Sequence, residues 1–363
     1  MRHSVALVAA VALLAAVPTA RAQAPAGPLP PPAHIQDAPK PTIRVKVDWV
    51  TTPVTVRDSK GELVLNLAQK DFRVFQDGAE QTIEHFDLGG DPLSVVFVVE
   101  NSSRVEPLLS AVRKTGILLS QEVMPGDVQA AVVMYDDKPH VLQDFTASGD
   151  AIERAVNHLP PGLSGAALFD ALSTGVDLLS RQPKNRRRFI LAMAEPVDTG
   201  SESKLGEVLR AAQLQNVTIY SVGLSTTAAE LRAEPRARSS PYPPGVYPTP
   251  GPPGIPQTPS TVQVQNSSAD LGALAIWIVQ HVKEAVKDHV LEVAAKSTGG
   301  AHIAAFKDRT IEKAVSEIAG ELHTQYTLGY RPTSGDATGF HTINVEVDHP
   351  GLKVRTRQGY YLE

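Results

Sequence analysis

The spacing of apolar residues divides the chain into two kinds of segment. Residues 42–90 alternate apolar and polar positions, as in TIRVKVDWVTTPVTVRDSKGELVLNL, and this alternation is the period of half-buried strands. The pair Asp77-Gly78, within KDFRVFQDGAEQTIEHF, is a strong hairpin signal. No stretch of useful length with helical spacing interrupts this region. Residues 42–90 are therefore predicted to form the first part of a small β module.

From residue 91 the pattern changes to buried strands that alternate with helices. LSVVFVVE is apolar without alternation, which is typical of a strand buried on both faces. A helical segment is expected over 105–123, and DVQAAVVMYD and KPHVLQDF are expected to be strands joined by a tight turn at Asp136-Asp137. Next come a helix, strand, helix and strand in ALFDALSTGVDLLSR, RRFILAMAE, SKLGEVLRAAQLQ and NVTIYSVGL. This order predicts an α/β domain over 91–323, with a doubly wound, mostly parallel sheet and helices on both faces.

A proline-rich stretch interrupts the α/β pattern at residues 225–268. Its sequence, including RARSSPYPPGVYPTPGPPGIPQTPS, can neither continue a helix nor build a core. We expect a disordered insertion, and a proline-rich ligand for a partner is the alternative. Beyond it, Gly299-Gly300 is expected to end a helix, and AHIAAF and DRTIEKAVSEIAGELHTQ predict a strand and a helix. Residues 324–363 alternate again, so they are assigned to the second part of the β module. The module is expected to be β-sandwich-like, and the α/β domain is then an insertion between its two parts.

The N-terminal residues and the composition bear on location and partners. Residues 1–22 have a charged start, an apolar stretch and an A-x-A ending, and they are predicted to be a signal peptide cleaved after Ala22. The apolar stretch is shorter than the ~20 residues of a membrane span, although an uncleaved anchor is the alternative. Residues 23–41 are rich in proline and alanine and are expected to be a solvated linker. A periplasmic or extracellular protein is therefore expected, with no membrane span.

Charge and cysteine content narrow the classes of partner. The net charge of -5 argues against a nucleic-acid partner. KNRRRF carries four positive charges in five residues, and we expect it to be a solvated turn before a strand. The chain has no cysteine, so its stability must come from packing rather than from disulfides.

Three stretches together resemble a known family. They are VTVRDSKGELVLNLAQKDFRVFQDGAEQTIEHF, the α/β pattern from LSVVFVVENSS through GAALFDAL and RRFILAMAEPVDTGS to VTIYSVGL, and the segment from YTLGYRP to RTRQGYY. They resemble the von Willebrand factor A-related domain proteins of the acidobacterial type over residues 42–363, apart from the proline-rich insertion. The paired first and last β segments are more specific than any single motif. The resemblance implies a doubly wound sheet with a metal-ion-dependent adhesion site at the carboxyl ends of its strands, where open α/β sheets bind ligands.

The resemblance also implies a set of metal ligands, and this chain keeps little of it. The family pattern is Asp-x-Ser-x-Ser after the first strand, a Thr before a later helix and an Asp after a later strand. The matching positions here are Glu100, Ser102, Arg104, Ala166 and Glu195. Mg²⁺ prefers about six oxygens in octahedral geometry, whereas Ala166 offers no side-chain oxygen and Arg104 adds a positive charge. We therefore predict a degenerate site, with Glu100, Ser102 and Glu195 as the remaining ligand candidates and no bound cofactor.

The loops around these positions are the candidate ligand face. Arg104 can replace the metal, either by pairing with Glu100 and Glu195 or by offering its charge to the carboxylate of a partner. Asp170 is expected to cap or to pair rather than to bind a metal. The other candidates on this face are Asn101, Ser103, Ser164, Ala166 and Asp198, where Asn101 and Ser103 can act as substitute oxygen donors and Asp198 is expected to support its loop.

The predicted function is a secreted or periplasmic, non-catalytic protein-binding or adhesion module. Its partner is an unidentified protein, and the sequence does not predict its oligomeric state. Two alternatives stay open. One is an envelope scaffold in which the α/β domain only packs. The other is a hydrolase that uses Ser164, although GLSGA does not match the Gly-x-Ser-x-Gly elbow of α/β-hydrolases.

Overall fold

The computed structural model describes residues 49–225, 289–305, 307–333 and 339–362. The predicted signal peptide, the linker and the proline-rich insertion lie outside the described residues, apart from residue 225. None of the described helices is long and apolar enough to cross a membrane.

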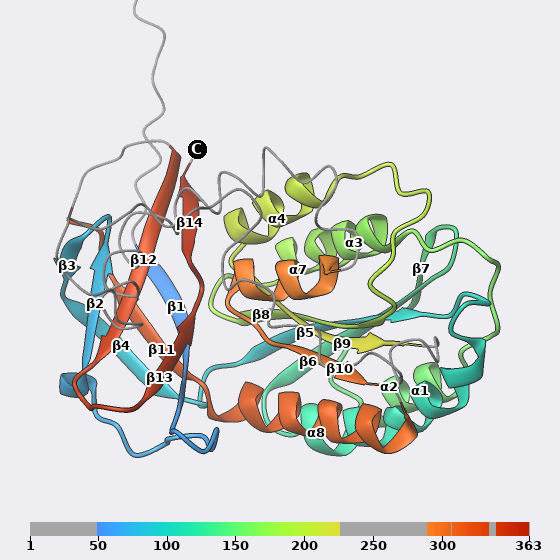
Figure 1. Ribbon diagram of the computed structural model, residues 1–363, viewed down its shortest axis with the longest axis horizontal. Helices are drawn as coiled ribbons and strands as arrows, with labels where there is room; N and C mark the ends of the chain where they lie inside the picture. The colour runs from blue at the N-terminus through green and yellow to red at the C-terminus, as the bar shows by residue number, and fades with distance from the viewer. Residues whose placement is uncertain (1–48, 226–288, 306, 334–338, 363) are drawn as a thin grey trace, which may run out of the picture. The chain divides into compact units, whose positions relative to one another are not determined.

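A six-stranded sheet forms the centre of the α/β domain, in the order β10-β9-β8-β5-β6-β7 (Figure 1). All neighbours pair in parallel except β7, which returns antiparallel to β6 after the turn at Asp136-Asp137 that the sequence predicts. All eight residues of β5 are buried, as its unbroken apolar run requires. The strands are β5 (Leu93–Glu100), β6 (Val128–Tyr135), β7 (Pro139–Thr146), β8 (Arg187–Ala194), β9 (Val217–Leu224) and β10 (His302–Ala305).

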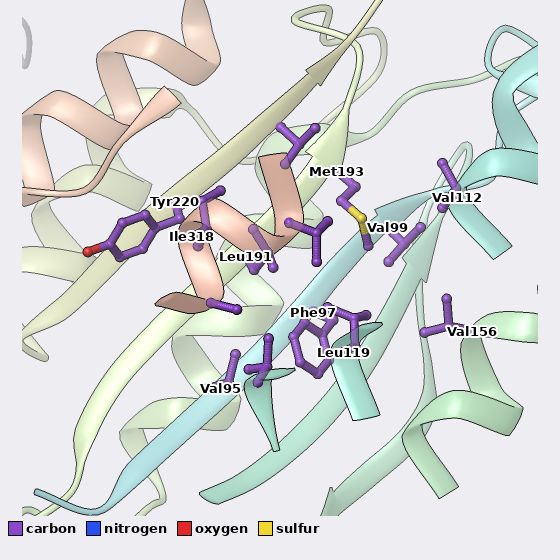
Figure 2. Close-up of a cluster of buried hydrophobic side chains, with 14 of the residues drawn as sticks. Val95, Phe97, Val99, Val112, Leu119, Val156, Leu191, Met193, Tyr220 and Ile318 are labelled. Carbon is purple, nitrogen blue, oxygen red and sulfur yellow. The ribbon is translucent and has the colours of Figure 1, made fainter. Parts of the chain in front are cut away.

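Helices cover both faces of this sheet (Figure 1). Because successive strand residues point to opposite faces, Val95, Phe97 and Val99 of β5 pack into one apolar cluster (Figure 2), while the residues between them pack into a second. α1 (Glu106–Leu118), its π-helical continuation η2 (Leu119–Val123), α2 (Gly149–Asn157) and α8 (Asp308–Thr324) supply the first cluster. α3 (Leu168–Ser180), α4 (Leu205–Leu214) and α7 (Val290–Thr298) supply the second.

The ends of two helices show how the sequence sets their limits. α7 ends at Gly299, whose φ of 86° is left-handed, and a Cβ on Gly300 would overlap the carbonyl oxygen of Ile219. The prediction that Gly299-Gly300 ends a helix is confirmed. α2 is absent from the sequence-based assignment. Its N-cap is Ser148, whose hydroxyl accepts a hydrogen bond from the Ala151 amide.

The first and last segments of the described chain form a β-sandwich. One sheet has the order β13-β1-β11-β4 and the other β14-β12-β2-β3, so each sheet combines early and late strands. Both sheets contribute to one apolar core, for example through Val54 and Val74. The predicted fold class, a doubly wound α/β domain with a β module built from both ends, is therefore confirmed. The sandwich elements are β1 (Val50–Arg57), η1 (Gln69–Asp71), β2 (Phe72–Gln76), β3 (Ala79–Gln81), β4 (Ile83–Leu88), β11 (Tyr326–Tyr330), β12 (Gly339–Val347), β13 (Lys353–Thr356) and β14 (Gly359–Leu362).

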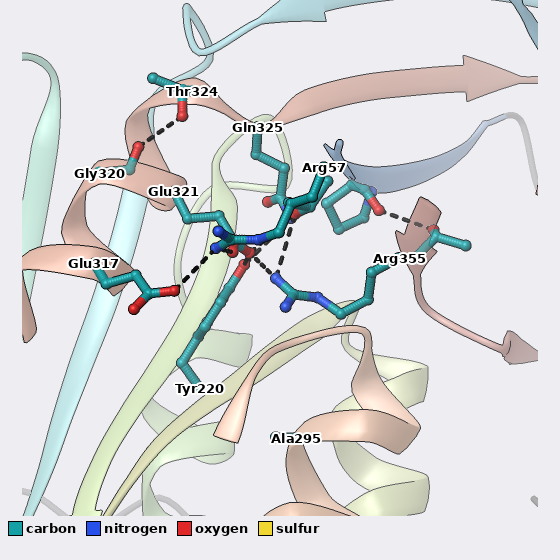
Figure 3. A network of polar contacts seen from close by, with 12 residues as sticks. Arg57, Tyr220, Ala295, Glu317, Gly320, Glu321, Thr324, Gln325 and Arg355 are labelled. Carbon is teal, nitrogen blue, oxygen red and sulfur yellow. Dashed lines mark hydrogen bonds and ion pairs between the residues drawn. The ribbon is translucent and has the colours of Figure 1, made fainter. Parts of the chain in front are cut away.

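A buried glutamate of α8 connects the sandwich to the α/β domain (Figure 3). Glu321 accepts hydrogen bonds from Thr55 Oγ1 at 2.9 Å, Arg57 Nη2 at 3.0 Å and Tyr220 OH at 2.7 Å. It also forms an ion pair with Arg355. Burial alone raises the pKa of Glu321, but the Arg355 guanidinium and these hydrogen bonds outweigh burial and leave the pKa below its ordinary value.

Candidate functional site

Two glutamates from adjacent strands meet at the carboxyl edge of the sheet. Glu100 is the last residue of β5, and Glu195 directly follows β8. Because β5 and β8 are parallel neighbours, their carboxyl ends lie together, and the Glu195 amide donates to Glu100 Oε2 at 2.7 Å. The structure thus brings together two residues that lie far apart in the sequence.

Glu100 is completely buried and receives its hydrogen bonds from neutral groups. The Ser102 hydroxyl donates to Oε1 at 2.6 Å, and the Tyr135 hydroxyl lies 3.4 Å from Oε2. Burial raises the pKa of Glu100 above its ordinary value, and the hydrogen bonds from Ser102 and the Glu195 amide only partly oppose this. Burial also raises the pKa of Tyr135, so its phenol keeps the proton that it donates. Tyr135 was not a sequence candidate; it reaches the site because it pairs in register with Glu100 across β5 and β6.

Arg104 forms an ion pair with Glu195 at this edge. Its Nε donates to Glu195 Oε2 at 3.0 Å. Of the two partners considered from the sequence, only Glu195 lies within ion-pair distance; Arg104 acts on Glu100 from farther away and lowers its pKa slightly. The Arg104 side chain is 37% exposed, so the guanidinium faces solvent while holding a nearly buried carboxylate.

The Ala166 position carries only a methyl group and is fully buried. Its backbone exchanges hydrogen bonds with Thr199, whose amide donates to the Ala166 carbonyl at 2.7 Å and whose Oγ1 accepts from the Ala166 amide at 3.0 Å. The contact between Thr199 and Ala166 was not predicted from the sequence, because it depends on how two loops meet.

Two nearby aspartates support loops. Asp198 Oδ1 accepts from the Phe169 amide at 3.0 Å and from the Ser201 hydroxyl at 2.6 Å, at the start of α3. Asp170 accepts from the amides of residues 202 and 203 at 2.9 and 2.8 Å. Burial alone raises the pKa of Asp170, but the hydrogen bonds from Ser203 and residue 202 leave it below its ordinary value. Both side chains therefore fix loops against α3.

Arg104 belongs to an exposed rim formed by two loops. We define the rim as Ser103, Arg104, Leu163 and Ser164, all of which are exposed. The two loops are joined because the Ser103 amide donates to the Leu163 carbonyl at 2.8 Å, and Leu163 is 63% exposed. Ser164 makes no hydrogen bond to a histidine within the described part of the chain.

Asn101 lies beneath the rim rather than on it. Its Nδ2 donates to the Pro160 carbonyl at 3.0 Å, and its buried Oδ1 has no hydrogen-bond partner among the described residues. The side chain therefore holds the loop that carries Leu163 and Ser164, and a single buried amide oxygen remains at its inner side.

These residues do not fit a magnesium coordination shell as they are arranged. Both Glu100 oxygens already accept hydrogen bonds, and the Ser102 hydroxyl directs its proton at one of them. At ~4 Å and an effective dielectric near 20, a dication beside the Arg104 guanidinium costs on the order of 8 kcal/mol. Among the described residues, no cluster of three or more histidine or acidic side chains is placed to hold a metal ion.

Comparison with known proteins identifies the domain. Residues 94–234 match the family model of the von Willebrand factor type A domain, and no curated protein matches the chain. Similar solved structures include the protein BatB from Bacteroides thetaiotaomicron, at 13% identity over 63% of this chain and 98% of that one, with a TM-score of 0.40. The vWF domain of the type V pili tip protein Mfa5 from Porphyromonas gingivalis is 15% identical over 64% and 95%, with a TM-score of 0.38. The proximal thread matrix protein 1 from the mussel byssus, with a zinc-occupied MIDAS (metal-ion-dependent adhesion site) motif, is 11% identical over 69% of this chain and 50% of that one, with a TM-score of 0.42. The family match confirms the von Willebrand A resemblance for residues 94–234.

Proposed function

We propose that this von Willebrand factor A-related protein is an exported protein-binding or adhesion module, and that its rim binds a partner without a divalent metal. The observation that carries the proposal is the Arg104–Glu195 ion pair at the carboxyl edge of the sheet. In the family pattern, a metal ion at this edge offers positive charge to an acidic residue of the partner. Here a guanidinium offers positive charge at the same edge.

The geometry of Arg104 supports a direct role in recognition. Its Nε is engaged by Glu195, while its two Nη groups have no hydrogen-bond partner in the described part of the chain. A guanidinium can bind a carboxylate through two parallel N–H donors, which gives both strength and orientation. The neighbouring Leu163 adds an apolar contact that such a partner could bury. The partner's anchor is therefore proposed to be an Asp or Glu side chain.

Metal titration tests the proposed loss of metal dependence. In calorimetry with Mg²⁺ or Mn²⁺, we expect no saturable heat from the unmodified protein at millimolar ion. The double variant Arg104→Ser plus Ala166→Thr restores two hydroxyls and removes the opposing charge, so it should gain measurable affinity. Saturable millimolar binding by the unmodified protein would contradict the proposal.

Partner capture tests the ligand face. The full chain, immobilised and exposed to envelope extracts, should retain its partner equally well with and without EDTA. Arg104→Ala should reduce retention about tenfold or more, as expected for a central charged contact. Arg309→Gln, which removes an exposed arginine at the start of α8, is the matched control and should bind normally. Retention that EDTA abolishes, or that survives Arg104→Ala, would refute the assignment of this face.

A further inference from the structure

The opposite edge of the central sheet, where its strands begin, holds buried arginines. β8 begins with Arg187 and Arg188, whose exposed fractions are only 9% and 8%. Arg186, directly before them, forms a 2.7 Å ion pair with Asp127. Neither Arg187 nor Arg188 has a carboxylate within ion-pair distance in the described part of the chain. Burial lowers the pKa of both, which expresses the cost of holding a charge away from water.

The acceptors that these two arginines do find are neutral. Arg187 donates to the Leu322 carbonyl and to the side-chain oxygen of Gln325. Arg188 donates to the carbonyls of Gln182 at 2.7 Å and Gln215 at 3.0 Å. The Leu322 carbonyl lies in the last turn of α8, and those of Gln182 and Gln215 lie just beyond the ends of α3 and α4; helix C-termini carry partial negative charge. That partial charge eases the burial of two full charges but does not neutralise them. The Nε atoms of both arginines have no hydrogen-bond partner among the described residues.

A third buried arginine lies beside them. Arg357 is 5% exposed, and its guanidinium lies 5.5 Å from the centre of the Tyr360 ring. Its Nη1 donates to Asn216 Oδ1 at 2.7 Å, and its Nε has no hydrogen-bond partner within the described ranges. Within the described residues it too lacks an ion pair, and burial lowers its pKa to about 10. Asn216 therefore connects a third unpaired cation to the place where β9 begins.

The nearest carboxylates are already committed elsewhere. Asp91, Asp87 and Glu321 act on Arg187 from beyond ion-pair distance. Glu321 is shared by Arg57 and Arg355, and the Asp87 carboxylate accepts from the backbone amides of residues 90 and 91. Among the described residues, these carboxylates act on Arg187 only from a distance and none forms an ion pair with it.

A small cavity lies among these groups, between the sandwich and the edge of the sheet. It has about 20 Å³ of space for water-sized spheres. A site needs roughly 10–15 Å³ to hold one water molecule, so this cavity has room for a water molecule or a small ion. The buried Thr327 hydroxyl on its wall finds no hydrogen-bond partner in the part of the chain that the structure describes. Its polar lining comprises Arg187, Arg188, Asn216, Thr51, Thr218 and Thr327.

We propose that this cavity is a binding site for a small monovalent anion, with chloride as the ligand of matching size and charge. Guanidinium groups and hydroxyls offer protons, and guanidinium accepts none, so a ligand that only accepts suits the wall better than water does. The one side-chain carbonyl on the wall, that of Asn216, is occupied by Arg357. A bound anion also compensates buried charges that are otherwise costly.

Thermal unfolding of the full chain tests the proposal in solution. At constant pH and ionic strength, sodium gluconate is replaced stepwise by sodium chloride. A ligand that binds only the folded state raises the unfolding midpoint, so we expect a chloride-dependent upward shift. Arg188→Gln should lose this shift. Arg309→Gln lies at the N-terminal end of α8, whereas Leu322 lies at the C-terminal end. It changes the net charge equally and should keep the chloride-dependent shift. A midpoint that is unchanged by chloride, or that rises only with sulfate or phosphate, would overturn the assignment.

Crystallography of the unmodified protein gives a second test that does not depend on any variant folding. Crystals grown in bromide should show an anomalous peak within the cavity, in contact with Arg187 and Arg188. No peak there would assign the cavity to water. A peak there without any chloride-dependent shift in solution would mean an adventitious ion only, and either outcome would refute the proposal.

Discussion

The two edges of the central sheet solve the problem of buried charge in opposite ways. At the carboxyl edge, the buried Glu100 is surrounded by neutral donors, and the nearly buried Glu195 is held by Arg104 from the solvent side. At the amino edge, Arg187 and Arg188 are the buried charges, and they find only neutral acceptors. At the carboxyl edge, the charge of Glu195 is thus compensated by Arg104 of the same chain. The amino edge leaves its countercharge to be supplied from outside.

Two buried glutamates show that partners, rather than depth, set the direction of a pKa shift. Burial acts in the same direction on Glu100 and Glu321. Glu321 contacts two guanidinium groups and its pKa is lowered, whereas Glu100 contacts a hydroxyl and an amide and its pKa is raised. We therefore expect the two sites to respond differently to substitution and to acid.

The largest expected loss of stability follows from replacing Glu321. Glu321→Ala removes the carboxylate that pairs with the half-buried Arg355 and leaves the buried Thr55 and Tyr220 hydroxyls without their acceptor. It should lower the free energy of unfolding by about 3 kcal/mol. Denaturant unfolding measures it. Glu317→Ala is the matched control, because Glu317 lies one helical turn earlier, also pairs with Arg57 and is 44% exposed. It should cost less than about 1 kcal/mol. Equal losses from the two variants would contradict the role assigned to Glu321.

Acid should remove most of the stability that Glu321 contributes to the folded state. The pKa of Glu321 is lower in the folded state, so its stabilising contribution is complete above the unfolded value, about 4.3, and is lost as pH falls through the folded value. Unfolding of the unmodified protein and of Glu321→Gln is compared from pH 7 to pH 3. We expect the gap between them to be constant near neutrality and to narrow below about pH 4. A gap that widens on acidification would mean that the pKa is raised instead.

The smallest expected effect is at the carboxyl edge. Arg104→Ala removes an ion pair whose cation faces solvent, so the free energy of unfolding should fall by no more than about 1 kcal/mol. Denaturant unfolding in low and high salt measures this loss and its screening. A loss above about 2 kcal/mol would show that Arg104 serves the fold rather than recognition, and would weaken the proposed ligand face.

Much of the fold follows from local patterns, and what was missed depends on distant contacts. The apolar run of β5, the turn between β6 and β7 and the glycines after α7 act within a few residues, and the sequence predicts them. α2 spans only nine residues, which is too short for a clear helical period. KNRRRF was expected to be solvated, and this prediction is wrong for Arg187 and Arg188, because distant residues such as Thr51 and Thr327 cover them.

The candidate site shows the same limit. The meeting of Glu100 and Glu195 follows from two parallel strands that end side by side, and a sequence pattern can supply this. Tyr135 reaches Glu100 only through the register of β6 against β5, and Thr199 reaches Ala166 only through the meeting of two loops. Neither relation leaves a signal in the local sequence, so both required the structure.

Because the sandwich combines early and late strands, it can fold only after the rest of the chain has been synthesised. β1 and β2 emerge first from the ribosome, yet their partners β11, β13 and β12 are synthesised after the whole α/β domain. Until then the early strands expose unpaired edges, which are open to aggregation or to a holding chaperone. A nascent chain stopped just after α8 should therefore carry a folded α/β domain and a protease-sensitive N-terminal segment. Once the last residues are released, the N-terminal and C-terminal segments of the sandwich should become protected together.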